Sequence, residues 1–116
     1  MNFLSLTCLE KFKHLFFIVQ QLYSLGARKV IVTAVGQIGC IPYQLARYHG
    51  NSSRCNEKIN TAVSLFNTGL RKLVDLFNGG QLPGAKFVYL DSYQSTSDLY
   101  LNASNYGNLL CTHIQP

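Results

Sequence analysis

The sequence has few charged residues and no long apolar run, and both shortages limit what the chain can be. Charged residues make up 13% of the 116 positions and hydrophobic residues 47%, proportions typical of a globular domain rather than of a disordered chain. The longest uninterrupted apolar run covers only residues 15–19, far short of the ~18–20 residues that span a bilayer. We therefore expect at most one globular domain, without a membrane span.

Acidic residues are scarce, and this weakens two functional interpretations. Five Asp and Glu stand against ten Lys and Arg, which gives a net charge of +5. The five acids are dispersed, so the sequence shows no neighbouring pair of carboxylates for general acid–base catalysis. The basic residues are dispersed as well, whereas a nucleic-acid binder gathers them into a patch or stripe. We expect no nucleic-acid partner.

The chain also lacks the short motifs that mark common catalytic, cofactor and metal sites. It has no GxSxG turn, which would expose a nucleophilic serine between a strand and a helix. Gly36 and Gly39 form only a GxxG, without the third glycine of a dinucleotide site or the GK[ST] of a P-loop, so a tight turn is favoured. No two cysteines have the CxxC spacing of a zinc site. The prediction is that the chain binds no cofactor and no metal.

Three histidines are candidate general bases, and each has a plainer explanation. His14 falls in a helical stretch as a surface residue, His49 lies in a polar loop, and His113 is near the C-terminal end. Asp91 and Ser92 follow a strand, where a nucleophile could lie, but a helix cap is the better interpretation. The sequence therefore predicts no catalytic residue.

A helix and then a strand are predicted in the first third of the chain. Gly26 ends the helix, because glycine enters the left-handed conformation of a helix C-terminus without steric cost. Residues 29–35 are β-branched and almost continuously apolar, as in a strand covered on both faces of a parallel sheet. Over residues 9–25 apolar side chains recur every three or four positions, which predicts a core-facing stripe of Leu15, Ile18, Leu22 and Leu25.

The rest of the chain continues this alternation. Apolar side chains three and four apart predict a long helix over residues 56–77, with Ser53 or Asn56 as its N-cap. A second strand is expected at 86–90, and shorter helices at 41–48 and 95–101. The order predicts an α/β fold with a βαβ unit, in which a right-handed crossover joins two parallel strands. Two strands make an incomplete sheet with open edges.

Cysteines and sequons leave several possibilities open. Asn51 and Asn102 are acceptors of N-glycosylation sequons, which are compatible with secretion. Cys40 and Cys55 are fifteen residues apart across a loop-like stretch, within reach of a disulfide. The four cysteines (Cys8, Cys40, Cys55 and Cys111) allow three pairings, and their spacing does not choose among them.

Read together, several blocks resemble one family. LYSLGARKVIV at 22–32 is followed by GQIGCIP at 36–42, then by Cys55, Asn56, Asn60 and the pair Phe66-Asn67, then by LPGAKFVYLDSY at 82–93 and Tyr-Gly at 106–107. These blocks, in this order, resemble the plant GDSL esterase/lipase family of the SGNH hydrolases over about residues 21–107.

The resemblance implies an incomplete three-layer α/β/α, flavodoxin-like fold. For the whole family it implies hydrolysis of small carboxylic esters or lipids, often by secreted proteins. The catalytic parts of that family would be a serine in a GDS block, oxyanion donors from a glycine and from the asparagine of a GxND block, and the Asp and His of a DxxH block. None of these blocks occurs in the 116 residues. We therefore expect a family member or fragment that is inactive by itself.

Both ends depart from the family pattern. The predicted organisation is a divergent segment at 1–20, a partial SGNH hydrolase domain at 21–107 and a divergent tail at 108–116. This leaves Cys40–Cys55 as the expected disulfide, because Cys8 and Cys111 lie outside the resemblance. Charged residues at positions 10, 11 and 13 interrupt the first apolar stretch, which does not fit a secretory signal, so the family's secretion is not carried over to this chain.

Two residues are expected near a substrate in the complete protein. Ligands of open α/β sheets bind beyond the carboxyl ends of the strands, so Gln37 and Tyr93 are predicted to line an acyl pocket. An alternative function is a non-catalytic interaction protein that pairs its open strand edge with an intact homologue. Another is a small flavodoxin-like binding module, which would need phosphate-loop chemistry that the GxxG does not supply.

Overall fold

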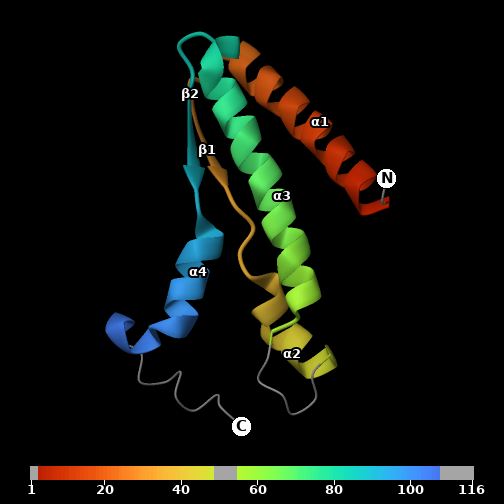
Figure 1. The fold of residues 1–116 in the computed structure, drawn as a ribbon. Coiled ribbons are helices and arrows are strands. Elements are labelled where there is room, and N and C mark those ends of the chain that lie inside the picture. The colour runs from red at the N-terminus through yellow and green to blue at the C-terminus, as the bar shows by residue number, and fades with distance from the viewer. Residues whose placement is uncertain (1–2, 49–54, 108–116) are drawn as a thin grey trace. The chain divides into compact units, whose positions relative to one another are not determined.

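The structure of the protein is a computed structural model that describes residues 3–48 and 55–107 (Figure 1). Three short helical turns, η1 (Ile38–Cys40), η2 (Phe77–Gln81) and η3 (Ala103–Tyr106), accompany the longer elements. In chain order these longer elements are α1 (Phe3–Ser24), β1 (Lys29–Thr33), α2 (Pro42–Tyr48), α3 (Glu57–Leu76), β2 (Lys86–Leu90) and α4 (Ser92–Leu101). None of the described helices has the length and apolarity needed to cross a membrane.

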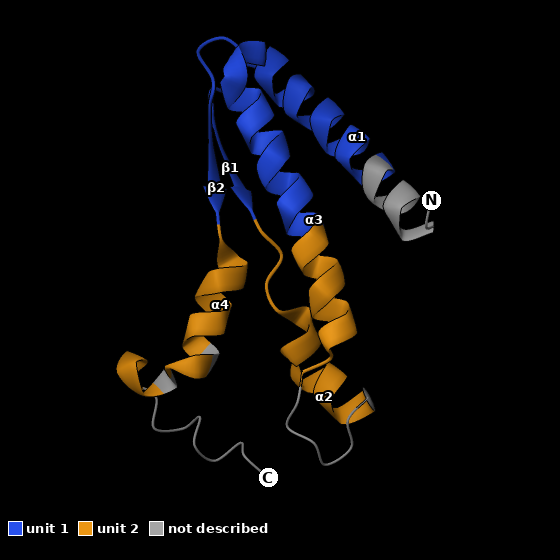
Figure 2. Ribbon diagram, viewed as in Figure 1, with its two compact units in different colours: residues 1–33, 66–90 blue, residues 34–65, 91–116 orange. Residues whose placement is uncertain are grey.

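The chain divides into two compact units (Figure 2). One consists of residues 1–33 and 66–90, and the other of residues 34–65 and 91–116. Helix α3 contributes its second half to the first unit and its first half to the second. We call them unit 1 and unit 2 and describe each by itself.

Unit 1 contains the sheet. Strands β1 and β2 pair in parallel over five residues, from Lys29 opposite Lys86 to Thr33 opposite Leu90 (Figure 1). Parallel neighbours need a crossover connection, and α3 supplies it. The structure therefore confirms the predicted incomplete α/β fold with a βαβ unit.

One face of this sheet forms the core of unit 1. Val30 and Val32 on β1 lie opposite Phe87 and Tyr89 on β2, and all four side chains pack into the cluster formed with α1 and α3. Phe77 is its most buried member, with 1% of its surface exposed. Its ring centroid lies 5.3 Å from that of Phe16 and 4.9 Å from that of Phe87, so it joins α1 to β2.

The long central helix follows its predicted stripe. Val63, Leu70 and Phe77 are buried, and Ile59, Phe66 and Leu73 are half-buried. Asn56 precedes α3, and its Oδ1 accepts a hydrogen bond of 3.4 Å from the amide of Ile59, in the manner of an N-cap. The other predicted cap, Ser53, lies outside the described residues.

The core-facing stripe predicted for α1 is wrong at three of its four positions, and only Leu15 is half-buried. Phe12 is half-buried, and its ring stacks on Phe66 at 5.2 Å. The same ring lies over Gly69, where an added Cβ would come within 2.5 Å of it. Because α1 is apolar on more than one side, periodicity alone does not show which side faces the core. The aromatic side of α1 fits the space over Gly69 on α3. The residues packed inward are Phe12, Phe16 and Val19, while Ile18, Leu22 and Leu25 are exposed.

The expectation that the first strand is covered on both faces is also wrong. Ile31 on β1 is 69% exposed, and Val88 opposite it on β2 is 47% exposed. Both helices of unit 1 pack on the opposite face of the sheet. The side chains of Val30, Val32 and the alternate residues of β2 point to that face. The strand is also shorter than predicted, ending at Thr33, where the pairing with β2 ends.

Replacing Phe77 by Ala tests the core of unit 1. Loss of a fully buried ring that contacts two other rings should lower the free energy of unfolding by about 3–5 kcal/mol. Urea denaturation followed by circular dichroism measures this loss. The control is Leu76→Ala at the neighbouring position, where 47% exposure predicts a loss of less than about half that size. Equal losses in the two variants would contradict the packing described.

Candidate functional site

The carboxyl ends of β1 and β2 lead into the segments where a ligand site was expected. In unit 2, Ser92 donates a hydrogen bond from its hydroxyl to the carbonyl oxygen of Ala34, which links the first residue of α4 to the residue that follows β1. Asp91 caps α4, and its Oδ1 accepts from the amide of Gln94 at 3.0 Å. The predicted helix cap is confirmed. It also explains why α4 begins at Ser92, three residues earlier than predicted.

These hydrogen bonds engage the hydroxyl and the carboxylate that a nucleophilic site at this position would need. The Ser92 hydroxyl is engaged with a backbone carbonyl, and the Asp91 carboxylate with the start of a helix. His14 is exposed on α1, and the two other histidines, His49 and His113, lie outside the described residues. A serine nucleophile needs a hydrogen bond to a base, whereas the hydroxyl of Ser92 is bonded to a backbone carbonyl.

The turn after β1 is built as a scaffold rather than as a phosphate cradle. The amides of Ile38, Gly39 and Cys40 donate to the Gly36 carbonyl at 2.8 Å, to Asn60 Oδ1 at 2.9 Å and to the Gln37 carbonyl at 3.0 Å. A phosphate loop presents such successive amides to its ligand, and here internal acceptors already bind them. The tight-turn interpretation of the GxxG is therefore the one that fits.

Gly39 lies between this turn and the start of α3. Its carbonyl accepts from the amide of Asn56 at 2.8 Å, and an added Cβ would lie 2.4 Å from the Asn56 carbonyl oxygen and 2.6 Å from Asn60 Oδ1. Asn60 is almost fully buried, and the bond from Gly39 satisfies its amide oxygen. Glycine is required because two backbone segments approach too closely for any side chain. The sequence pattern included Asn60 but gave no hint of this role.

A disulfide joins the same turn to the chain before α3. Cys40 and Cys55 are bonded, with their Cα atoms 4.4 Å apart. In the chain-entropy model, closing a loop of this length stabilises the folded state by ~3 kcal/mol. Asn60 Nδ2 lies 3.5 Å from Cys40 Sγ, so the buried amide and the disulfide form one clamp. Cys8 and Cys111 have no described side chains.

The two residues predicted to line a pocket lie on two segments that contact each other, the turn after β1 and α4. Gln37 and Tyr93 are both half-buried, one in the turn after β1 and the other in the first turn of α4. Between these segments, Gly36 faces Thr96, and an added Cβ would lie 3.4 Å from Thr96 Oγ1. The structure thus places both residues on the segments that follow the strand ends.

A second polar cluster closes the end of α4. Asp98 accepts hydrogen bonds from the Tyr106 hydroxyl and, at 2.6 Å, from Asn102 Nδ2. The bond from Tyr106, and then that from Asn102, lowers the pKa of the Asp98 carboxyl, while the same bond raises the pKa of Tyr106. The depressed carboxyl pKa means that this contact is present above the ordinary aspartate pKa and is lost as the pH falls through the lowered value. Asn102, a sequon acceptor, is exposed, and Asn51 lies outside the described residues.

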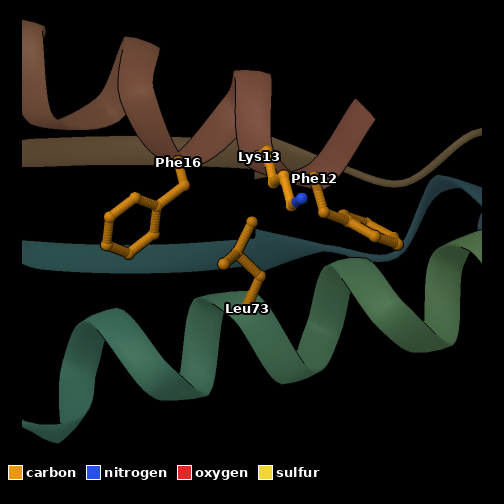
Figure 3. Close-up of a pocket in the computed structure, with 4 residues that line it drawn as sticks. All are labelled: Phe12, Lys13, Phe16 and Leu73. Carbon is orange, nitrogen blue, oxygen red and sulfur yellow. The ribbon is translucent and has the colours of Figure 1, made fainter. Parts of the chain in front are cut away.

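A shallow hollow of about 300 Å³ lies between α1 and α3 in unit 1 (Figure 3). Phe12, Lys13, Phe16 and Leu73 line it, and Leu73 projects from α3 toward the two rings. Its walls are apolar apart from one ammonium group, so it offers no nucleophile or general base. Neither this hollow nor the described residues elsewhere hold a group of three or more potential metal ligands.

Replacing Gly39 by Ala tests the scaffold interpretation of the turn. The added methyl would overlap backbone and a buried amide, so the free energy of unfolding should fall by about 1–3 kcal/mol in urea denaturation. Gly79→Ala is the matched control, because an added Cβ there meets nothing within 4 Å, and its effect should stay within about 0.5 kcal/mol. A Gly39→Ala variant as stable as the control would show that the turn does not pack as described.

Comparison with known proteins assigns this architecture to a family. The sequence model of the GDSL-like Lipase/Acylhydrolase family matches residues 12–109. GDSL esterase/lipase At1g33811 of Arabidopsis thaliana is 67% identical over 90 residues, which are 75% of this chain and 24% of the relative. GDSL esterase/lipase 7 of the same plant is 43% identical over 90 residues, or 77% of this chain and 24% of the relative.

The matches cover most of this chain but only a small part of each relative. The chain spans about a quarter of the length of these relatives. No solved structure matches. The family model nevertheless covers most of the 116 residues, including both strands and the crossover helix between them. The chain therefore belongs to the GDSL-like lipase/acylhydrolase family.

Proposed function

We propose that this chain is the central scaffold of a GDSL-type carboxylic-ester hydrolase and does not hydrolyse esters by itself. The observation that supports this is the absence from its 116 residues of any GDS, GxND or DxxH block, in a chain that otherwise matches the family. Acyl transfer by this route needs an attacking hydroxyl, a base that takes its proton, and donors for the oxyanion. The residues closest to such chemistry, Asp91 and Ser92, act instead as a helix cap and a strand-end link.

In the complete protein, the substrate would be a small carboxylic ester or a lipid, as the esterase/lipase names of the relatives suggest. We further propose that the complete protein is secreted and glycosylated at Asn51 or Asn102. Exposure of Asn102 and a disulfide in unit 2 support this, because disulfides persist in oxidising compartments. A mass unchanged by endoglycosidase treatment of the secreted protein would count against glycosylation.

An assay of the purified chain with p-nitrophenyl acetate tests the central proposal. Loss of the nucleophile and base together costs about 10⁶-fold in turnover, so the rate should equal that of buffer. A full-length relative serves as the positive control. Turnover that is abolished by a serine-directed inhibitor and by Ser92→Ala would overturn the proposal, because Ser92 would then be a nucleophile rather than a structural link.

The proposed pocket residues are tested in a full-length relative that carries residues 21–107 of this chain in place of its own matching segment. If Gln37 and Tyr93 line the acyl pocket, Gln37→Ala and Tyr93→Ala should change the ratio of kcat/KM for octanoate over acetate esters by about tenfold, the size of a lost apolar contact. Lys58→Ala, exposed on α3, is the control. An unchanged ratio in both pocket variants would contradict the assignment.

A second candidate function, pairing with an intact homologue, rests on the outer edge of β1 in the two-stranded sheet, because the edge of β2 is occupied. Asn78 donates from Nδ2 to the carbonyl of Phe87 at 2.9 Å and accepts from the amide of Phe87 at 3.0 Å. A side-chain amide thus takes the place of a neighbouring strand on β2 and blocks that edge. An added strand would therefore pair with β1.

A further inference from the structure

A single side chain occupies the edge of β2 that faces away from β1. The amide of Lys86 donates to the carbonyl of Arg28 at 2.7 Å, on the side of β1, so the backbone groups of the next residue, Phe87, point to the other edge. Asn78 binds both groups: its Nδ2 donates to the Phe87 carbonyl at 2.9 Å, and its Oδ1 accepts from the Phe87 amide at 3.0 Å. The two bonds together require a side-chain amide, which offers a donor and an acceptor in one planar group.

Asn78 is also the only asparagine of the sequence that a glycine follows. Asparagine is a thermally labile residue, because the carbon of its side-chain amide lies within reach of the next backbone nitrogen. Glycine at that next position leaves the nitrogen unshielded by a side chain. Asn78 and Gly79 are both exposed, and an added Cβ on Gly79 would meet nothing within 4 Å, so water reaches the pair.

We propose that Asn78 is a site of spontaneous deamidation, and that this modification releases the edge of β2. The backbone nitrogen of Gly79 gives its proton to water and bonds to Cγ of Asn78, the bond from Cγ to Nδ2 breaks, and the amino group takes up a proton and leaves as ammonia. Water then opens the resulting succinimide ring at either of its carbonyl groups, which leaves aspartate or isoaspartate at this position. The reaction consumes only water, and the inference does not rest on the proposed ester hydrolysis.

The folded turn restrains this reaction. Within η2 only Gly80 departs from helical backbone angles, so Asn78 is helical, and its side-chain amide is held by the backbone of Phe87. Cγ must leave this position to meet the nitrogen of Gly79, so the reaction proceeds when η2 opens locally. Local opening is favoured here because the segment is exposed and contains two adjacent glycines, whose backbone gains much entropy on release.

Neither product holds β2 as the amide does. An aspartate keeps one oxygen that accepts from the Phe87 amide, but its second oxygen faces the Phe87 carbonyl where Nδ2 donated, so an attraction becomes a repulsion. An isoaspartate adds a methylene group to the main chain and shortens the side chain, which displaces both bonds. In either case the backbone groups of Phe87 lie at an open strand edge.

The first test follows the reaction in the full 116-residue chain. The chain is incubated at mildly alkaline pH, and peptide mapping by mass spectrometry locates each side chain that exchanges its amino group for a hydroxyl. We expect this change at Asn78 before any other asparagine, divided between aspartate and isoaspartate, and faster in urea, which opens η2. Gly79→Ala should slow it severalfold, because the added methyl shields the nitrogen, while circular dichroism stays that of the wild type. Earlier modification elsewhere, or an equal rate in Gly79→Ala, would overturn the proposal.

Asn78→Asp tests the release of the edge, because it installs one of the two products. Amide hydrogen exchange read by NMR should be about tenfold faster at Phe87 in this variant, the equivalent of one lost hydrogen bond. The amide of Lys86, which is bonded on the side of β1, should change less. Asn105→Asp, at an exposed position of unit 2, adds the same charge and should leave exchange at Phe87 unchanged. Wild-type exchange at Phe87 in Asn78→Asp, or an equal rise at Lys86, would overturn the proposal.

Discussion

The parallel pairing of β1 with β2 is the constraint on which the rest of unit 1 depends. Parallel neighbours cannot be joined by a tight turn, so the chain must cross over, and α3 makes this crossover. The crossover brings the apolar stripe of α3 onto one sheet face, where Phe77 packs between Phe16 and Phe87. Burial of this face supplies the main stabilisation of unit 1, and Ile31, Val88 and Leu90 on the opposite face stay exposed.

In unit 2, the segments that follow the two strands form structural contacts rather than a catalytic site. In open α/β sheets the strand ends are where ligands bind, yet here the Ser92 hydroxyl, the Asp91 carboxylate and the amides of the turn after β1 form bonds within the chain. Gly39 and Asn60 satisfy each other, the disulfide from Cys40 fixes the same turn, and Ser92 links the chain after β2 to Ala34. These bonds within the chain agree with the proposed scaffold role.

The sequence predicted those features that depend on local pattern. The stripe of α3 was assigned correctly because the apolar side chains of that helix are concentrated on one side, although Leu65 and Leu76 are exposed. The core-facing side of α1 was predicted wrongly because this helix is apolar on several sides. The side that faces the core is the one whose Phe12 ring fits over Gly69 on α3. The strand at 29–35 was expected to be covered on both faces because a continuous apolar run is typical of such strands. The run does not show whether helices lie on one face of the sheet or on both.

The candidate site depended on contacts between distant residues, which periodicity cannot reveal. Asn60 pairs with Gly39 across 21 positions, and Asn78 caps the β2 edge nine residues away. Asn60 is buried on α3, although solvent exposure is the usual expectation for a polar side chain on a helix. The absence of catalytic blocks, by contrast, could be read from the sequence alone, because the chemistry needs particular residue types.

Amide hydrogen exchange of the purified chain, read by NMR, tests most directly whether the strand pairing exists in solution. The account predicts slow exchange for the amides within β1 and β2 that pair across the sheet, and for those of the second half of α3, because all open only when unit 1 unfolds. Strand amides that exchange as fast as those of an unstructured peptide, while α3 alone remains protected, would contradict the account.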